Sequence, residues 1–248
     1  MRAVGLHFIG SGDAFGRGGR LQACLRLSGA GPTVLIDCGA SSLAGMKRDC
    51  VDPNDVDMVV LSHLHGDHFA GLPYLVLDGQ FAHRERSLTI VGPPGTADRL
   101  TATMEALFPG SSTERRRFDV QHRAIAPGES ITVGGVEITA YAAAHASGAQ
   151  SLSLRVGYGG RTIAYSGDTE WTDELAEVAR DADVFVCEAY YFERPVRYHL
   201  DWATLRDHRS ELSCQRLILT HMSKDMLDRV QEVDGDVTVA RDGLMLTV

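Results

Sequence analysis

The sequence predicts an α/β protein in which two mixed β-sheets pack face to face and helices cover the outside. Apolar runs of strand length alternate along the chain with longer segments of helical periodicity. This alternation occurs loosely twice, once in each half of the 248 residues. Both halves also place His and Asp residues directly after apolar runs. Together these observations predict a sandwich with a polar site along one edge.

Length and composition fit a single domain spanning residues 1–248. Hydrophobic residues make up 44% of the chain, which is enough to bury a sizeable core. The 24 basic residues are outnumbered by 33 acidic ones, for a formal net charge of −9. A protein that neutralises many phosphates is usually basic, so we expect no extensive nucleic-acid interface and favour a small substrate.

The cysteines and the N-terminus indicate the compartment. The five cysteines are scattered and odd in number, and no two form a CxxC pair, which is typical of reduced thiols. Residues 4–9 resemble a strand rather than the apolar segment of a signal peptide. No apolar run approaches the roughly 20 residues of a membrane span. We therefore expect a soluble cytoplasmic protein with no membrane association.

The first half begins with a strand at residues 4–9, where apolar residues alternate with others. A glycine-rich loop at residues 10–19 follows. Because this loop precedes a strand and lacks the lysine of a P-loop, it gives little support for nucleotide cradling. Further strands are expected at residues 22–28, 33–37, 58–61 and 88–92.

Three helices are expected in the first half. Residues 41–47 form a short one. Residues 69–81 form an apolar helix with Gly71 and Pro73 in its first turn, where proline costs least. Residues 96–107 have the pattern of an amphipathic helix that packs on a sheet.

The second half contains shorter apolar runs separated by glycine-rich turns. Strands are expected at residues 131–133, 136–141, 152–156, 162–165 and 183–186, with another apolar run at residues 217–219. A helix is expected at residues 201–212. The segment 234–248 is predicted to supply closing strands of the second sheet.

A dense group of metal-binding side chains follows the apolar run at residues 58–61. His63, His65, Asp67 and His68 lie within six positions. At the end of a strand, His63 and His65 point to one side because they are two residues apart. The glycine between the pairs lets the chain turn, so Asp67 and His68 face a second point nearby. Two neighbouring ions fit this spacing, and the ligand types suit zinc, with manganese or iron as alternatives.

This motif and its context resemble a known family. The run SHLHGDHFAGLP at residues 62–73, together with VLIDCG at residues 34–39, is similar to the metallo-β-lactamase superfamily, and within it to the ribonuclease Z and phosphodiesterase branch. The resemblance implies a four-layer αββα sandwich, in agreement with the order of strands and helices. It also implies that Asp37 supports the metal-binding loop without being a ligand.

The resemblance extends the metal site into the second half of the chain. His145, Asp168 and His221 follow three later strands, in the order of the family's remaining motifs. The complete set would give one ion His63, His65 and His145 and the other ion Asp67, His68 and His221, with Asp168 bridging both.

The same resemblance implies hydrolytic chemistry. Two such ions would share a water or hydroxide and lower its pKa to about 7, which supplies a nucleophile that Asp67 is placed to orient. In ribonuclease Z relatives, a Glu and a later His act as an acid pair near the leaving group. Glu188 and His199 match this pair in order and distance, although the residues around His199 differ from the family's. We predict His199 as the general acid.

Other residues are candidate substrate contacts. In the resembling family the glycine-rich loop borders the active site, so Phe15, Arg17 and Arg20 are candidates, with ordinary surface charge as the alternative for the arginines. The arginines at 115–117 are explained equally by a solvated turn. The aromatic residues at 190–192 suit either stacking on a base or core packing.

These features favour a dinuclear metal-dependent phosphodiesterase that acts on a small nucleotide-like or cyclic phosphodiester. A carboxylic ester, lactone or thioester hydrolase is the alternative, because the same ligands serve all these reactions. The chain shows no insertion with the Gly- and Lys-rich composition of the family's RNA-binding arm, which disfavours transfer-RNA 3′ processing. A non-catalytic nucleotide-binding module would be expected to lack ligands. Relatives often dimerise, so the resemblance suggests a homodimer, although no sequence feature defines an interface.

Overall fold

The first of two β-sheets is built mainly from the N-terminal half. A computed structural model describes residues 3–248. In spatial order the strands of the first sheet are β14 (Met245–Thr247), β1 (Gly5–Gly10), β2 (Cys24–Ser28), β3 (Thr33–Ile36), β4 (Val56–Val60), β5 (Leu88–Gly92) and β6 (Val120–Ala124). Strands β3 to β6 run parallel and strands β14 to β3 run antiparallel, so the sheet is mixed, as predicted.

The second sheet has the same organisation. Its strands in spatial order are β13 (Thr238–Val239), β12 (Leu217–Thr220), β11 (Val184–Glu188), β10 (Arg161–Tyr165), β9 (Leu152–Tyr158), β8 (Val136–Ala142) and β7 (Ser130–Val133). Strands β10 to β13 are parallel, whereas β7 to β10 are antiparallel. Each sheet therefore has a parallel half, and the carboxyl ends of those parallel strands form the edge that carries the polar loops.

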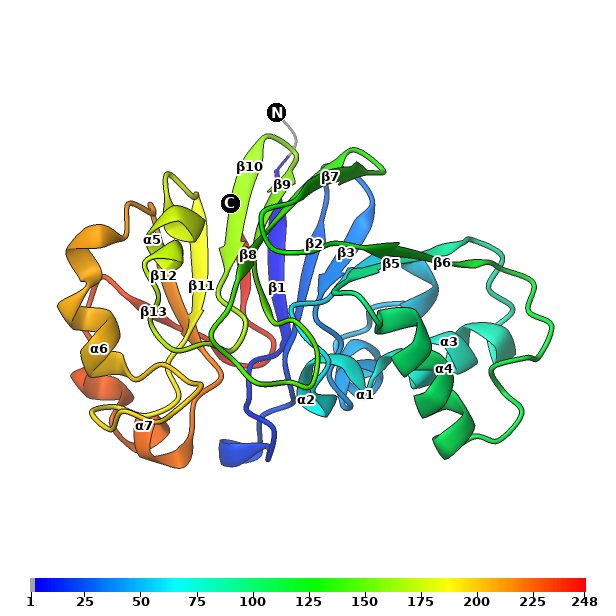
Figure 1. Ribbon diagram of the computed structural model, residues 1–248, viewed down its shortest axis with the longest axis horizontal. Coiled ribbons are helices and arrows are strands. Elements are labelled where there is room, and N and C mark those ends of the chain that lie inside the picture. The colour runs from blue at the N-terminus through cyan, green and yellow to red at the C-terminus, as the bar shows by residue number, and fades with distance from the viewer. Residues whose placement is uncertain (1–2) are drawn as a thin grey trace.

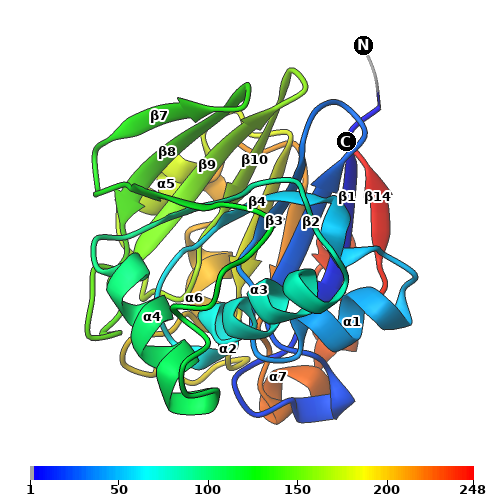
Figure 2. The ribbon, with the colours of Figure 1, turned by 90° about the vertical axis from the view of Figure 1, so that its right-hand side faces the viewer.

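Helices cover the outer face of each sheet (Figures 1 and 2). On the first sheet they are α1 (Ser42–Arg48), α2 (Gly66–Phe69), α3 (Leu72–Phe81) and α4 (Thr96–Leu107). On the second they are α5 (Glu174–Ala179), α6 (Trp202–Asp207) and α7 (Lys224–Asp228). Short 3₁₀ turns occur at Arg17–Gly19, Pro53–Asp55, Arg209–Glu211 and Val230–Glu232. The predicted αββα sandwich is confirmed, and no helix within residues 3–248 has the length and apolarity to cross a bilayer.

Three apolar cores separate the four layers. Within β3, Val34 and Ile36 point between the sheets, whereas Leu35 packs toward the helices of the first sheet. In β11, Phe185 packs on the other side of the second sheet, in the core that also contains Trp202 of α6. Successive side chains of a strand point to opposite faces, so strands covered on both sides are apolar throughout. This burial explains why the predicted strands appear as nearly continuous apolar runs.

The structure corrects several predicted boundaries. The helix predicted at residues 69–81 is α3, which begins at Leu72 and ends at Phe81 as predicted, and the separate short helix α2 precedes it. The helix predicted at residues 201–212 ends at Asp207 and continues as a 3₁₀ turn. The sequence analysis did not predict the remaining elements β6, α5 and α7.

The C-terminal segment divides between the two sheets, so the prediction that residues 234–248 close the second sheet is only half correct. Strand β13 does lie at the edge of that sheet, but β14 pairs antiparallel with β1 of the first sheet. Asp242 holds the crossing, because its carboxylate accepts the backbone N–H groups of Ser11 at 2.9 Å and Leu21 at 2.7 Å. A short strand pattern does not reveal which sheet the strand joins, and here the partly buried Asp242 contacts fix the path of the chain.

Candidate metal centre

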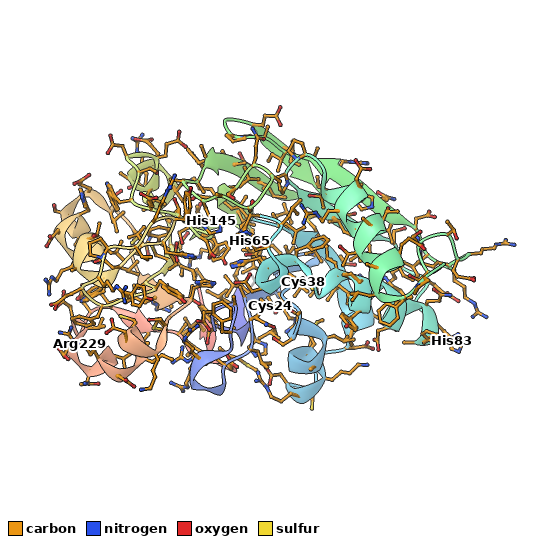
Figure 3. The ribbon with its side chains drawn as sticks, turned by 60° about the horizontal axis from the view of Figure 1, so that its bottom comes forward. Cys24, Cys38, His65, His83, His145 and Arg229 are labelled. Atoms are coloured by element: carbon orange, nitrogen blue, oxygen red, sulfur yellow. The ribbon has the colours of Figure 1, made fainter. Side chains whose placement is uncertain are left out.

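All seven predicted metal ligands meet at the polar edge of the sandwich. Figure 3 shows His65 and His145 close together near the middle of the molecule. Two groups have ligand atoms that all lie within 4.8 Å of one another. The first contains His63, His65 and His145, and the second contains Asp67, His68, Asp168 and His221. The grouping reproduces the division that the resemblance implies.

Asp168, which follows β10, lies between the two groups. Its carboxylate is 3.2 Å from Nε2 of His68 and 3.5 Å from Nε2 of His221. It is also 3.8 Å from Nε2 of His63 and 4.0 Å from Nε2 of His145. Oδ1 faces His68, whereas Oδ2 approaches His63 and His145 of the first group as well as His221 of the second, so the carboxylate lies in a position that could bridge the two groups.

Ring nitrogens of the cluster face one another directly. Nε2 of His145 lies 2.9 Å from Nδ1 of His65, and Nε2 of His68 lies 3.3 Å from Nε2 of His221. Nε2 of His63 is buried and has no hydrogen-bond partner within residues 3–248. Converging imidazole lone pairs and carboxylates are the donor set of zinc and related divalent ions. The residues therefore fit a dinuclear metal site.

Asp37 fixes the orientation of the cluster from behind. Its carboxylate accepts the Ser62 backbone N–H at 2.7 Å and the Ser62 hydroxyl at 2.8 Å, and lies 2.6 Å from Nδ1 of His68. Ser62 in turn places its hydroxyl 3.0 Å from Nδ1 of His63. Because Nδ1 of both histidines is engaged, their Nε2 lone pairs point into the cluster. This geometry agrees with the supporting role that the resemblance implies for Asp37.

His145 is oriented from the second half of the chain. Its Nδ1 donates to the backbone carbonyl of Tyr198 at 2.8 Å, which directs Nε2 toward His65. The Tyr198 backbone N–H donates to the Glu170 carboxylate at 2.8 Å. Tyr198 and Glu170 were not predicted from the sequence, because neither belongs to a ligand motif. The sequence feature that could have identified them is that Tyr198 adjoins His199 and Glu170 lies close to Asp168.

The backbone at Gly39 lies unusually close to the backbone at Asp67 and Gly71. This close approach explains why α2 and α3 are separate helices. A Cβ atom added at Gly71 would lie 2.3 Å from the Gly39 carbonyl oxygen, and one added at Gly39 would lie 2.2 Å from the Asp67 carbonyl oxygen. Only glycine permits this approach. Asp37 and His221 also have left-handed backbones, with φ of 58° and 56°. Such conformations are costly for residues with a side chain and cluster at functional sites.

Charges within the cluster shift the pKa values of its members. Burial lowers the pKa of His63 well below its ordinary value. Burial alone would raise the pKa of Asp168, but the facing imidazoles of His221 and His68 bring it well below the ordinary value. Burial lowers the pKa of His221, but the carboxylates of Asp168, Asp67 and Glu188 together more than offset this, and the net pKa is about 9. Without a metal ion, protons on the imidazoles therefore balance the carboxylates.

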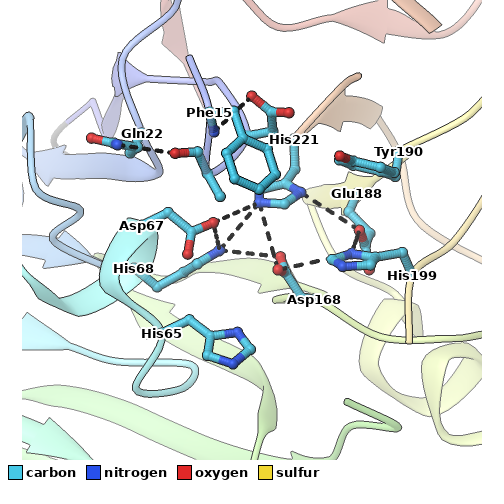
Figure 4. A network of polar contacts seen from close by, with 12 residues as sticks. Phe15, Gln22, His65, Asp67, His68, Asp168, Glu188, Tyr190, His199 and His221 are labelled. Carbon is cyan, nitrogen blue, oxygen red and sulfur yellow. Dashed lines mark hydrogen bonds and ion pairs between the residues drawn. The ribbon is translucent and has the colours of Figure 1, made fainter. Parts of the chain in front are cut away.

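Glu188 and His199, the predicted acid pair, are in contact beside this cluster (Figure 4). Oε2 of Glu188 lies 2.9 Å from Nδ1 of His199, and the other oxygen accepts the Thr169 backbone N–H. The same His199 nitrogen is 3.9 Å from Asp168. Burial, reinforced by Asp168, raises the pKa of Glu188. Burial lowers the pKa of His199, but the hydrogen bond and negative charge of Glu188 together with the charge of Asp168 more than compensate, so the net shift is upward.

These two residues also belong to a third group able to hold a metal ion, together with Asp168 and His221. We do not assign an ion to it, because one Glu188 oxygen is occupied by a backbone N–H and the other by His199. The hydrogen-bonded pair is the simpler explanation of this contact. It leaves Nε2 of His199 free of side-chain hydrogen bonds within the described chain.

The rim of the site includes part of the glycine-rich loop. The Tyr190 ring stacks on the His199 ring, with centroids 4.9 Å apart and planes inclined by 26°. Arg17 lies 3.5 Å from the Tyr190 hydroxyl and forms an ion pair at 2.6 Å with the buried Asp13 carboxylate. Phe15, from the same loop, is 74% exposed. Arg17 and Phe15 therefore remain substrate-contact candidates.

Other candidates from the sequence have structural explanations. Arg20 is half-buried and donates to the Ala240 carbonyl at 2.6 Å, so it links the loop to the C-terminal segment. Phe192 is buried in the third core, which separates it from Tyr190 of the same aromatic run. Arg116 donates to the Ser111 carbonyl in the loop after α4 and does not reach the metal cluster.

The sequence of this chain is similar to those of known proteins. A family model described as "Beta-lactamase superfamily domain" matches residues 32–222, a range that includes every predicted ligand. An uncharacterised protein of Mycobacterium leprae is 32% identical over 225 residues, which cover 86% of this chain and 77% of that protein.

Two further comparisons are with proteins of described activity. A ribonuclease Z of Haloferax volcanii is 28% identical over 307 aligned positions, covering 100% of this chain and 95% of that protein. The crystal structure of a diphosphatase from the PhnP family superposes with a TM-score of 0.77 at 19% identity, covering 100% of this chain and 98% of the other. The alignment with the ribonuclease Z exceeds the 248 residues of this chain, so that relative contains segments with no counterpart here.

Proposed function

The chain belongs to the metallo-β-lactamase superfamily, in its ribonuclease Z-like branch, and on this basis we propose that it is a dinuclear zinc-dependent phosphodiesterase acting on a small nucleotide-like or cyclic phosphodiester. The observation that carries the proposal is the contact between Glu188 and His199 directly beside the metal cluster. Cleavage of a phosphodiester expels an alkoxide, which needs a proton. A histidine held next to the reacting centre is suited to supply one.

When bound, two divalent ions would act as Lewis acids and lower the pKa of an attacking water to about 7. The protein's own residues then orient the attacking water and transfer protons. Asp67 is buried, and its Oδ2 lies 3.1 Å from Nε2 of His221, so this carboxylate is held where it can accept a hydrogen bond from the attacking water. Asp168 keeps the two halves of the cluster together.

His199 is placed to give a proton to the leaving group. Its Nδ1 is held by Glu188, a buried carboxylate that favours the protonated imidazole. Its ring is confined on one side by Tyr190. The remaining nitrogen, Nε2, is therefore available to give a proton to the leaving oxygen, after which the Glu188 carboxylate favours return of the proton.

The size of the substrate is inferred from what surrounds the site. The curated ribonuclease Z relative acts on RNA by its name, and it contains segments with no counterpart in this chain. The net charge of −9 also disfavours contact with many phosphates. Both points support a small substrate over a transfer-RNA precursor, and the diphosphatase with the same fold supports phosphate ester chemistry in a chain of this kind.

The alternative is a carboxylic ester, lactone or thioester hydrolase. The test compares hydrolysis of bis(p-nitrophenyl) phosphate, a 3′,5′-cyclic nucleotide, p-nitrophenyl acetate and a lactone by the zinc-loaded protein. Turnover of both phosphodiesters, with loss of turnover in Asp168→Ala, would support the proposal. His199→Ala should slow the cyclic nucleotide far more than the p-nitrophenyl diester, because p-nitrophenolate leaves without a proton. Hydrolysis of the acetate or lactone alone would overturn it.

A further inference from the structure

A small cleft adjoins His199 on the side of the second sheet's helices. It has a volume of about 190 Å³ and lies between the loop after β10 and the start of α6. Its walls include Glu170, Trp171, Pro195, Val196 and His199. A leaving group must touch the residue that protonates it. If His199 gives a proton to the leaving oxygen, the rest of that leaving group lies beside His199. The cleft is next to His199 and could therefore hold it.

The walls of the cleft are tied to the metal centre. One carboxylate oxygen of Glu170 accepts the Tyr198 backbone N–H at 2.8 Å, and the Tyr198 carbonyl accepts Nδ1–H of His145. The Glu170 backbone N–H donates to the Ala144 carbonyl at 3.2 Å. The cleft is therefore attached through two hydrogen bonds to the segment that carries a predicted metal ligand. It is preformed at a constant position relative to the reacting centre.

Trp171 gives the cleft an aromatic wall. The indole is partly exposed, and its ring stacks on the His208 imidazole with centroids 4.1 Å apart and planes inclined by 15°. His208 in turn lies 2.7 Å from the Glu211 carboxylate through Nδ1. This support holds the indole in one orientation. A rigid, partly exposed indole beside apolar Pro195 and Val196 is suited to a flat, aromatic group.

The carboxylates of Glu170 and Asp201 determine which flat groups the cleft can bind. Oε1 of Glu170 is occupied by the Tyr198 N–H, whereas Oε2 forms no hydrogen bond within residues 3–248. Asp201, which also lines the cleft, uses both oxygens to cap α6 at Thr204. The cleft thus offers one free carboxylate oxygen as an acceptor. Two carboxylates repel a phosphate at this position, so a polynucleotide that continued into the cleft would be disfavoured.

We propose that this cleft is the leaving-group subsite of the phosphodiesterase and that it binds a nucleobase carrying an exocyclic amino group. The base packs against Trp171 and donates its amino N–H to Oε2 of Glu170. The substrate class is then a phosphodiester whose leaving oxygen belongs to a nucleoside of adenine, cytosine or guanine. This inference rests on the proposed function, because only a hydrolase with an alkoxide leaving group gives the cleft that role.

Cytidine and uridine test the cleft without any hydrolysis. They have the same size, but cytidine carries an amino group where uridine carries a carbonyl. With zinc-loaded protein, we expect cytidine to bind about tenfold or more tightly than uridine in calorimetry, because the hydrogen bond is to a charged acceptor. Cytidine should also quench tryptophan fluorescence. The quenching reports Trp171, since Trp202 is 0% exposed.

Glu170→Gln gives the sharpest variant. Its amide oxygen can still accept the Tyr198 N–H, which leaves an NH₂ group facing the cleft in place of Oε2. The preference should then invert, so that uridine binds more tightly than cytidine. In Trp171→Leu we expect both nucleosides to bind about tenfold more weakly, by loss of stacking. Arg197→Gln is the matched control, because Arg197 is exposed on the same loop but does not line the cleft.

The possible outcomes distinguish failure of the cleft proposal from failure of the proposed function. If the p-nitrophenyl diester is hydrolysed but cytidine and uridine bind equally, or Glu170→Gln leaves the preference unchanged, the cleft proposal is wrong and the proposed function stands. If the nucleosides bind as expected but no phosphodiester is hydrolysed, the proposed function is wrong and the cleft is not a leaving-group subsite. Inversion by Glu170→Gln of both nucleoside affinity and the ratio of kcat/KM for cyclic CMP and cyclic UMP would support the proposal.

Discussion

The carboxylate of Asp37 lies 2.6 Å from Nδ1 of His68, and both residues are completely buried. Asp37 follows β3 and His68 lies on α2, which follows β4, so the contact joins two segments that leave adjacent parallel strands. A histidine whose Nδ1 is held in this way presents Nε2 to a metal ion in one orientation.

Replacing Asp37 tests this support. In Asp37→Asn we expect zinc affinity to fall about 10- to 100-fold, because the amide binds the imidazole more weakly and no longer accepts both Ser62 hydrogen bonds. Titration against a chromophoric chelator measures the change. The exposed Asp119→Asn is the control and should keep the wild-type affinity. Equal affinities for both variants would contradict the supporting role.

Asp168 should matter for both ions at once. Because its carboxylate approaches histidines of both groups, Asp168→Ala is expected to lower bound zinc from two ions per chain to one or none and to abolish hydrolysis. Elemental analysis after gel filtration measures the stoichiometry. Two ions retained in the variant would show that Asp168 does not bridge the groups.

The protonation of His221 predicts how pH affects the metal-free chain. Burial lowers the pKa of His221, but the carboxylates of Asp168, Asp67 and Glu188 together raise it to about 9, above its ordinary value of 6.5. A raised folded-state pKa stabilises the fold fully below the ordinary pKa, and this contribution is lost as pH rises toward 9. We therefore expect the melting temperature of chelator-treated protein to fall between pH 6.5 and 9.

Zinc should show the opposite trend over the same range. Binding must displace the proton from His221, so affinity is expected to rise with pH and protons should be released on binding. Calorimetry at pH 7 in buffers of different ionisation enthalpy counts these protons. A binding enthalpy that does not depend on the buffer would argue against a protonated His221.

Tyr190 is expected to be a positioning residue for His199. Its ring stacks on the imidazole at 4.9 Å, while its hydroxyl reaches Arg17 only at 3.5 Å. Tyr190→Phe should therefore keep most activity, whereas Tyr190→Ala should lower kcat for a cyclic nucleotide about tenfold and leave KM nearly unchanged, since a displaced general acid loses part of its contribution. The p-nitrophenyl diester provides the control, because its leaving group needs no acid. An equal loss on both substrates would instead indicate a general structural defect.

Many helices and strands could be predicted because short local patterns of apolar and polar residues specify them. The helix at residues 96–107 and the strand at residues 88–92 occur at the predicted positions. The start of the helix predicted at residues 69–81 was harder to predict, because the close approach of the chain at Gly39 and Gly71 delays it to Leu72 and this contact is distant in sequence.

The sequence by itself determined the metal-binding group at residues 63–68, because local spacing at a strand end suffices to converge four ligands. Only the tertiary structure decided what surrounds it. The contact of Glu188 with His199, the passage of β14 to the first sheet and the cleft beside Trp171 depend on which elements pack together. Such packing is a property of many distant residues at once. A motif can therefore name the ligands, whereas the substrate is selected by side chains that the fold brings to them.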